Sequence, residues 1–443
     1  MKVRLLLVVV VVLTMACAAS VVRGAARAGC SEWAQEVSLT GWVNWQVLLD
    51  RGPESELGPN AEPLALGNVA VFAQAGVVHG FRLADGQALW TYNSGLSVYG
   101  MWRWRGLVVV LSGLSGGGPA IAGETWGGKL TGLNAATSAV RWTLSMPGIG
   151  PQVDAVATAD GGLAVAAMTG QLLVVDLADG SVRWRHAITD SAGLAATAGL
   201  VLYGSTGRLT AYDDRTGVPR WAVASTDMDL PQMQRAGGLL LVNSGFSGSP
   251  VTAYTLATGR VAWTFETPAA QAGASASWAA VAAGTAGVAV AFANLPDPGR
   301  LYLLDLATGR VRWRAAALVG TGPLLTADGV IDVEGTAATG PLALVDRDAA
   351  DGRIRWQDRL PQSASAAGQD IEQLVQAGQL MLVQGNSAGH QPATLSAYRL
   401  QNGSLAWQTI LPENMAVSPV SVPGQGVLVQ PDAPSSGCGP VPV

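Results

Sequence analysis

The residue types that most often carry out catalysis are few in this chain and lie far apart. Its three histidines, His79, His186 and His390, fall in different parts of the sequence, and none has the HxxxH or HxxE spacing that pairs metal ligands on one element. No serine or cysteine is paired with a histidine in a recognisable context. We therefore expect no metal site and no nucleophilic catalytic residue.

One acidic segment superficially resembles a calcium-binding loop. It contains Asp346, Asp348 and Asp351 followed by Gly352. Such a loop needs an oxygen ligand at position 350, where the chain has Ala350. We interpret the segment as a two-residue expansion of a turn that recurs along the chain.

The N-terminus has the pattern of an export signal. Lys2 and Arg4 precede an apolar run from Leu5 to Val22. Cleavage could follow Ala18 or Ala28, and the run is also long enough to remain as a membrane anchor. Lipidation at Cys17 or Cys30 is a third outcome. We expect residues 1–28 to be a signal peptide or membrane anchor, and the rest of the chain to be extracytoplasmic.

Two cysteines would remain after such cleavage. Cys30 and Cys438 lie near the two ends of the chain, and in an oxidising compartment a pair of this kind predicts a disulfide. Two free thiols, or a lipid on Cys30, are the alternatives.

Composition excludes several classes of protein. Hydrophobic residues make up 49% of the chain and charged residues only 13%, which argues against a disordered chain or a coiled coil. A formal charge of -5 removes the electrostatic basis for nucleic-acid binding. Lysine is confined to Lys2 and Lys129, and with the heavy Ala, Gly and Val usage this suggests a GC-rich bacterial, actinomycete-like source.

Nine of the 15 tryptophans end copies of one repeated segment, such as LYLLDLATGRVRW at Trp313. Between Trp90 and Trp407 the copies recur about every 45 residues. A Gly stands four residues before the Trp in each copy, except that Ser138 replaces it once. The nine are Trp45, Trp90, Trp142, Trp184, Trp221, Trp263, Trp313, Trp356 and Trp407.

Each unit also contains a Gly-led apolar run of strand length, such as Gly162-LAVAAM. With the LxxxD run, the strand that carries the Trp and one further apolar stretch, this predicts four antiparallel strands per unit, which is typical of a β-propeller blade. A Trp repeated once per blade can wedge between neighbouring sheets and donate its N–H to a carbonyl there. We therefore expect an all-β fold with one propeller over residues 36–432, followed by a tail at 433–443.

The consensus LxAxDxxTGxxxW resembles the tryptophan-docking repeat of the quinoprotein, or pyrroloquinoline-quinone (PQQ), β-propellers over residues 36–430. The size and export signal look most like the BamB-like members of that family. Family precedent implies eight blades, whereas the chain has eight complete units and a ninth split between its two ends. Eight is the expectation from the family and nine the expectation from the count.

The resemblance extends less clearly to activity. Quinoprotein dehydrogenases hold their quinone against a disulfide of two adjacent cysteines, and this chain has no Cys-Cys pair. No position matches their calcium ligands or catalytic Asp. We predict no cofactor; PQQ with calcium remains as an alternative that no motif supports.

The tryptophans outside the repeat mark candidate binding residues. In Met101-Trp102-Arg103-Trp104-Arg105 aromatic and cationic residues alternate, so on a strand the two Trp would share one face and the two Arg the other. Both Trp could pack between blades, or they could form an exposed patch of the type enriched at binding hot spots. Trp126 and Trp278 lie in longer insertions and could line the same mouth of the ring.

Two classes of function follow. The first is a non-enzymatic extracytoplasmic propeller, monomeric, that binds a protein, a peptide or a cell-envelope component. The alternative is a PQQ-dependent oxidoreductase, or another cofactor-binding protein that uses the central channel.

Overall fold

The computed structural model describes the chain between residues 33 and 430. Gaps fall at 50–60, 75, 115–126, 148, 150–152, 168–169, 189–192, 206, 226–231, 244–249, 267–275, 295–296, 317–321, 336–341, 361–373, 386–393, 412–418 and 423–425. Residues 1–28 and 433–443, the three cysteines, Trp126 and His390 lie outside the described residues, so the predictions of export, lipidation and a disulfide lie there too. The described segments contain no helix that is both long and apolar enough to cross a membrane.

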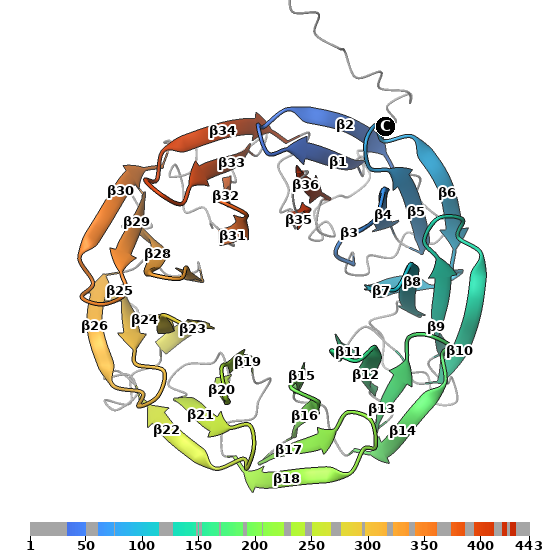
Figure 1. Ribbon diagram of the computed structural model, residues 1–443, viewed down its shortest axis with the longest axis horizontal. Coiled ribbons are helices and arrows are strands. Elements are labelled where there is room, and N and C mark those ends of the chain that lie inside the picture. The colour runs from blue at the N-terminus through green and yellow to red at the C-terminus, as the bar shows by residue number, and fades with distance from the viewer. Residues whose placement is uncertain are drawn as a thin grey trace, which may run out of the picture.

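The described strands form nine four-stranded antiparallel sheets, or blades, arranged in a ring (Figure 1). We number the blades in chain order, each from its innermost strand outward. Blade 1 is β3 (Leu64–Leu66), β4 (Val69–Gln74), β5 (Val77–Arg82) and β6 (Ala88–Asn93). Blade 2 is β7 (Ser97–Trp104), β8 (Leu107–Gly113), β9 (Gly127–Asn134) and β10 (Val140–Pro147). Blade 3 is β11 (Asp154–Ala157), β12 (Gly162–Ala167), β13 (Gln171–Asp176) and β14 (Val182–Ala187).

The next three blades repeat this order. Blade 4 is β15 (Gly193–Thr197), β16 (Leu200–Ser205), β17 (Arg208–Asp213) and β18 (Pro219–Ala224). Blade 5 is β19 (Gln232–Ala236), β20 (Leu239–Asn243), β21 (Val251–Thr255) and β22 (Val261–Phe265). Blade 6 is β23 (Ala276–Gly284), β24 (Gly287–Asn294), β25 (Asp297–Leu304) and β26 (Val311–Ala316).

The last three blades include the one that closes the ring. Blade 7 is β27 (Leu324–Leu325), β28 (Gly329–Glu334), β29 (Ala343–Asp348) and β30 (Ile354–Arg359). Blade 8 is β31 (Leu374–Ala377), β32 (Leu380–Gly385), β33 (Thr394–Arg399) and β34 (Leu405–Ile410). Blade 9 combines β35 (Val420–Val422) and β36 (Gly426–Val429) with β1 (Trp33–Ser38) and β2 (Val43–Leu48).

Blade 9 is built from both ends of the described chain. β1 pairs antiparallel with β36, from Gln35 opposite Val429 to Ser38 opposite Gly426. The split ninth unit therefore forms a complete sheet of its own. The count of nine from the sequence is confirmed, and the expectation of eight blades from family precedent is wrong.

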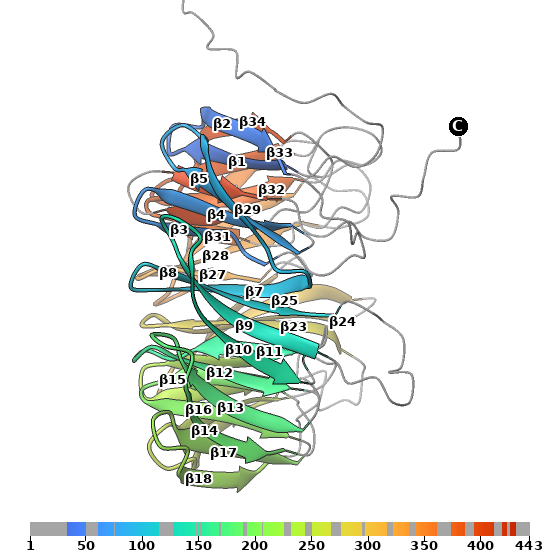
Figure 2. The ribbon, with the colours of Figure 1, turned by 90° about the vertical axis from the view of Figure 1, so that its right-hand side faces the viewer.

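The middle strands of each blade are covered on both faces by the neighbouring blades. Every residue of β12 is buried, as are all those of β4, which explains the uninterrupted apolar runs in the sequence. The outermost strands, such as β6 and β18, instead alternate between exposed and half-buried residues. Figure 2 shows the ring from its side, with successive blades following one another around it.

Each repeat Trp lies on the outermost strand of one blade and contacts the following blade. The indole N–H of Trp263 donates a 2.9 Å hydrogen bond to the carbonyl of Leu306. Its ring packs on Gly309, where an added Cβ would lie 2.5 Å from the indole. The Trp that donate in this way are Trp45, Trp90, Trp184, Trp221, Trp263, Trp313, Trp356 and Trp407.

Two positions vary this contact. Trp142 packs on Gly180, but its buried N–H has no hydrogen-bond partner among the described residues. In blade 2, Ser138 takes the turn position of the Gly with φ 56°, and Trp90 still donates to Ala135 at 2.9 Å. The nine Trp form a continuous series of contacts around the ring, from Trp45 of blade 9 onto blade 1 to Trp407 of blade 8 onto blade 9.

The Asp of the repeat stabilises the turn that presents this Gly. In blade 6, Asp305 Oδ1 accepts the N–H of Thr308 at 3.0 Å, and Oδ2 accepts Arg312 Nη2 at 2.7 Å. These hydrogen bonds lower the pKa of Asp305 to about 2, and the bond from Arg312 contributes more than the bond from Thr308. In blade 6, Asp305 therefore stays charged and organises the turn on which Trp263 of the preceding blade packs.

We predict that Gly309→Ala destabilises the protein more than Gly378→Ala. Both residues have positive φ, 66° and 63°, so both substitutions place an L side chain in the left-handed region at a cost of about 1–2 kcal/mol. Only at Gly309 would the methyl group also displace an indole, whereas an added Cβ at Gly378 meets nothing within 4 Å. Overpacking adds about 1–3 kcal/mol. Equal losses in urea denaturation would contradict the docking role of Gly309.

Candidate binding surface on the inner strand of blade 2

All but the last residue of the alternating aromatic and cationic segment lie on β7, the innermost strand of blade 2 (Figure 1). Trp102 and Trp104 are half-buried and pack on the apolar core shared by blades 2 and 3, together with Tyr99. Arg103 is exposed, and its Nη1 donates to the Ala65 carbonyl of blade 1 at 3.4 Å. The strand therefore uses one face for packing and leaves a cation on the other.

The position of Arg105 differs from the prediction. The strand ends at Trp104, so Arg105 is the first residue of the turn to β8 and does not follow the alternation. Its guanidinium carbon lies 5.0 Å from the centroid of the Trp104 ring. Arg105 therefore stacks on Trp104 instead of joining Arg103 on the opposite face.

The Trp104 ring is supported from the next blade. It packs on Gly161, whose φ is +89° and where an added Cβ would lie 2.2 Å from the indole. The indole N–H is buried and has no hydrogen-bond partner among the described residues. An unpaired buried donor costs about 1–3 kcal/mol, so the placement of this ring carries a local cost.

The turn that carries Arg105 has a conformation in which Gly is normally favoured. Arg105 and Gly106 have φ of 43° and 81°. The equivalent first turn residue is Gly67 in blade 1, Gly237 in blade 5 and Gly378 in blade 8, all with positive φ, while blade 4 has Ala198 with φ 52°. A left-handed L residue costs about 1–2 kcal/mol. An exposed cation–π contact stabilises the folded state by about 0.5–1 kcal/mol, which is no more than the cost of the left-handed conformation. The arginine therefore does not improve stability at this position.

The carboxylate nearest the supporting glycine is already neutralised. Asp160 accepts two 2.9 Å hydrogen bonds from Arg183 Nη1, and Arg215 Nε of blade 4 lies 3.0 Å from its Oδ2. Partial burial opposes the effect, but hydrogen bonds from Thr158 and Arg183 hold the pKa of Asp160 below its ordinary value. Asp160 is therefore paired with Arg183 and Arg215, and it does not neutralise Arg105.

The strand that carries Trp278 lies away from this group. Trp278 lies on β23, and Figure 1 places that strand across the ring from β7. The side chain of Trp278, like Trp126 as a whole, lies outside what the structure describes. Sequence reasoning missed Asp160, Gly161 and Arg215; the Asp-Gly-Gly turn of blade 3 was the available signal.

Two histidines have structural contacts. His79 is buried in β5 and stacks on Phe81 with the ring centroids 6.1 Å apart. His186 Nε2 donates a 2.7 Å hydrogen bond to the carbonyl of Gly217, and its ring stacks on Tyr212. No group of three or more His, Cys, Asp and Glu within the described part of the chain could hold a metal ion.

The acidic segment of blade 7 requires a correction. The turn Asp348–Gly352 has the same length as Asp305–Gly309, so its interpretation as an expanded turn is wrong. Asp348 Oδ1 accepts the Ala350 N–H at 2.7 Å within the turn. The two further carboxylates have other partners: Asp351 pairs with Arg353, and the buried Asp346 lies 2.8 Å from Arg355 Nε. The three do not converge on one point.

Taken together, these features define a Trp-docked β-propeller whose blade contacts repeat around a closed ring. The chain belongs to the family described as outer membrane protein assembly factor BamB, whose model matches residues 127–291, 169–322 and 247–427. No curated protein sequence matches the chain significantly.

Solved structures share the fold at low sequence identity. BamB from Moraxella catarrhalis is 19% identical, with a TM-score of 0.46 over 73% of this chain and 91% of that one. A eukaryotic initiation factor is 11% identical, with a TM-score of 0.57 over 90% and 98%. The dihydro-heme d1 dehydrogenase NirN is 12% identical, with a TM-score of 0.50 over 86% and 78%. Because proteins of such different names share it, the likeness concerns the fold alone.

Proposed function

We propose that this protein is a non-enzymatic, extracytoplasmic propeller that binds another protein or a peptide through the inner side of its ring. Membership of a family named for outer membrane protein assembly supports a protein partner in the cell envelope. The apolar N-terminal run from Leu5 to Val22 supports export.

The observation that carries the proposal is the inner edge of blade 2. Arg103 and Arg105 are exposed there beside two half-buried tryptophans. Tryptophan and arginine are the residue types enriched at protein-binding hot spots, where a rigid aromatic group supplies contact area and arginine supplies directional hydrogen bonds. Repeat folds present such extended surfaces without catalytic groups.

Site-specific photocrosslinking tests this proposal. We expect a photoreactive residue at Arg103 to give a discrete protein adduct in the cell envelope of the source organism. Thr264 is exposed on the outermost strand β22 and is a matched control position, which we expect to give no such adduct. Equal labelling at both positions, or none at Arg103, would contradict binding through the inner side.

A thermal-shift assay addresses the cofactor alternative. We expect PQQ with calcium to leave the melting temperature of the purified protein unchanged. Stabilisation by several degrees would replace the proposal with a cofactor-binding function, because a ligand that binds only the folded state raises its stability.

A further inference from the structure

We infer that the Arg105–Trp104 pair is a recognition site for a carboxylate of the bound protein, so that the partner presents an acidic segment to the inner edge of blade 2. The inference rests on the proposed function and names the chemistry of its ligand.

The first argument is the conformation of Arg105. Three other blades have glycine at the same turn position, and blade 4 has alanine. Strain at one residue is a reason to look for a use of its side chain. Because Ala198 has the same conformation, the case for Arg105 depends on its side-chain contacts. The Arg105 side chain is exposed, and no carboxylate among the described residues pairs with it.

The second argument is the direction in which Arg105 can form hydrogen bonds. The guanidinium carbon lies over the Trp104 ring, 5.0 Å from its centre, and the Arg105 side chain is otherwise exposed, so the indole contacts one side of the cation. A guanidinium donates in one plane and matches the two oxygens of a carboxylate. The indole therefore preorganises the group that would receive the ligand.

The third argument is the rigidity and charge of the surroundings. Gly161 of blade 3 packs against the Trp104 ring, so contacts between two blades fix the ring that Arg105 contacts. Arg103 adds an exposed cation from blade 2, while Asp160 is already paired with Arg183 and Arg215. In a protein of net charge -5, this inner rim offers an anionic segment a cationic docking point.

The test uses the purified full chain and two labelled peptides, one of alternating Gly and Glu and one of alternating Gly and Gln, in fluorescence-anisotropy titrations. We expect the Glu peptide to bind, and its affinity to fall with added salt. Arg105→Gly should weaken this binding about three- to fivefold, and Arg105→Lys about twofold, since lysine keeps the charge but not the planar fork.

The stability of Arg105→Gly separates recognition from a structural role. Glycine is unstrained at this φ, so we expect the melting temperature to stay unchanged or to rise by about 1–2 °C while affinity falls. Loss of stability together with affinity would show that Arg105 only maintains the turn, and would overturn the inference.

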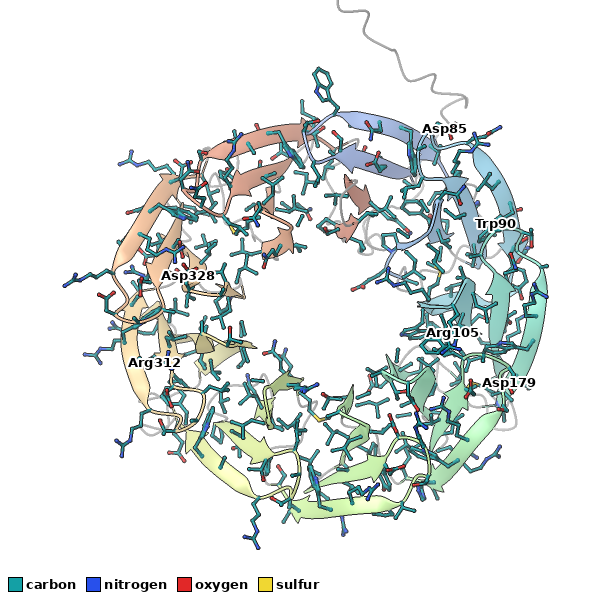
Figure 3. The ribbon with its side chains drawn as sticks, in the orientation of Figure 1. Asp85, Trp90, Arg105, Asp179, Arg312 and Asp328 are labelled. Atoms are coloured by element: carbon teal, nitrogen blue, oxygen red, sulfur yellow. The ribbon has the colours of Figure 1, made fainter. Side chains whose placement is uncertain are left out.

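Two control variants separate the two effects of Arg105→Gly, which relaxes the backbone and removes a charge. Ala198→Gly makes the same backbone change in blade 4 without changing charge, and Arg314→Ala removes an exposed cation from the outermost strand of blade 6. Figure 3 shows how far apart these regions lie, with Arg105 on one side of the ring and Arg312, two residues before Arg314, on the other. We expect both controls to bind the Glu peptide as the wild type does. Equal weakening by Arg314→Ala would overturn the inference in favour of diffuse charge attraction.

The outcomes also separate the inference from the proposed function. If both peptides bind equally, or only the Gln peptide binds, carboxylate recognition is wrong even when Arg103 gives a protein adduct. If no adduct forms at Arg103, the proposed function is wrong, whatever the peptides do.

Discussion

Trp45→Ala is expected to lower the free energy of unfolding by about 3–5 kcal/mol, the range for removing a buried tryptophan. Trp45 is 4% exposed, and its N–H donates to the Leu83 carbonyl of blade 1 at 2.8 Å. Its ring also contacts Phe72 and Phe81 at centroid distances of 6.1 and 6.0 Å. Because Trp45 belongs to the split blade, its removal leaves a cavity where blade 9 meets blade 1.

The same hairpin supplies the matched control. Trp42 lies in the turn between β1 and β2, is 70% exposed and does not belong to the repeat. Trp42→Ala should change the stability by no more than about 0.5 kcal/mol. Urea denaturation followed by circular dichroism measures both. If the two variants lose equal stability, the docking of Trp45 does not hold blades 9 and 1 together.

Asp332→Val is expected to stabilise the protein by about 1–3 kcal/mol at pH 7, because it removes a buried carboxyl group that lacks a hydrogen bond. Asp332 lies on β28 of blade 7, is 4% exposed, and neither of its oxygens has a hydrogen-bond partner among the described residues. Arg347 keeps its ion pair with Glu334, so the substitution leaves no new charge unpaired.

The contribution of Asp332 to the stability of the wild type falls as the pH rises. Burial, reinforced by the nearby Glu334, raises the pKa of Asp332 well above its ordinary value, despite the opposing charge of Arg347. The folded state therefore binds the Asp332 proton more tightly than the unfolded state does. The resulting stabilisation is complete below the unfolded pKa, near 3.8, and is lost as the pH rises through the folded pKa.

Asp346 contributes in the same direction. Burial raises its pKa to about 6, although Arg355 opposes the shift. We therefore expect the wild type to lose stability from about pH 4 upward, and Asp332→Val to lose less. Its remaining loss should end near pH 6, where Asp346 has ionised. An unchanged slope for Asp332→Val would show that this carboxyl group ionises normally.

Much of the fold could be predicted from local sequence because the repeat encodes it locally. The Gly four residues before the Trp occupies a left-handed turn position, as with Gly309. Where an Asp stands eight residues before the Trp, as with Asp305, it organises that turn through contacts within one hairpin. Each of these roles depends on neighbours in the sequence. The turn and the strand that carries the Trp are therefore visible without a structure.

The candidate site was less predictable because it depends on residues from different blades. Alternation predicted that Trp102 and Trp104 share a face, but it could not show that the strand ends before Arg105 or that Gly161 supports Trp104. The unpaired state of Asp332 likewise depends on which groups the neighbouring strands bring near it.

By itself, the sequence determined a propeller of four-stranded blades with one docking Trp per unit, because period, turn chemistry and strand patterning are local properties. Only the tertiary structure decided that nine blades close the ring, since closure depends on β1 pairing with β36 across the whole chain. The tertiary structure also decided that Arg105 packs on the ring of Trp104, because that ring is held in place by Gly161 of the next blade.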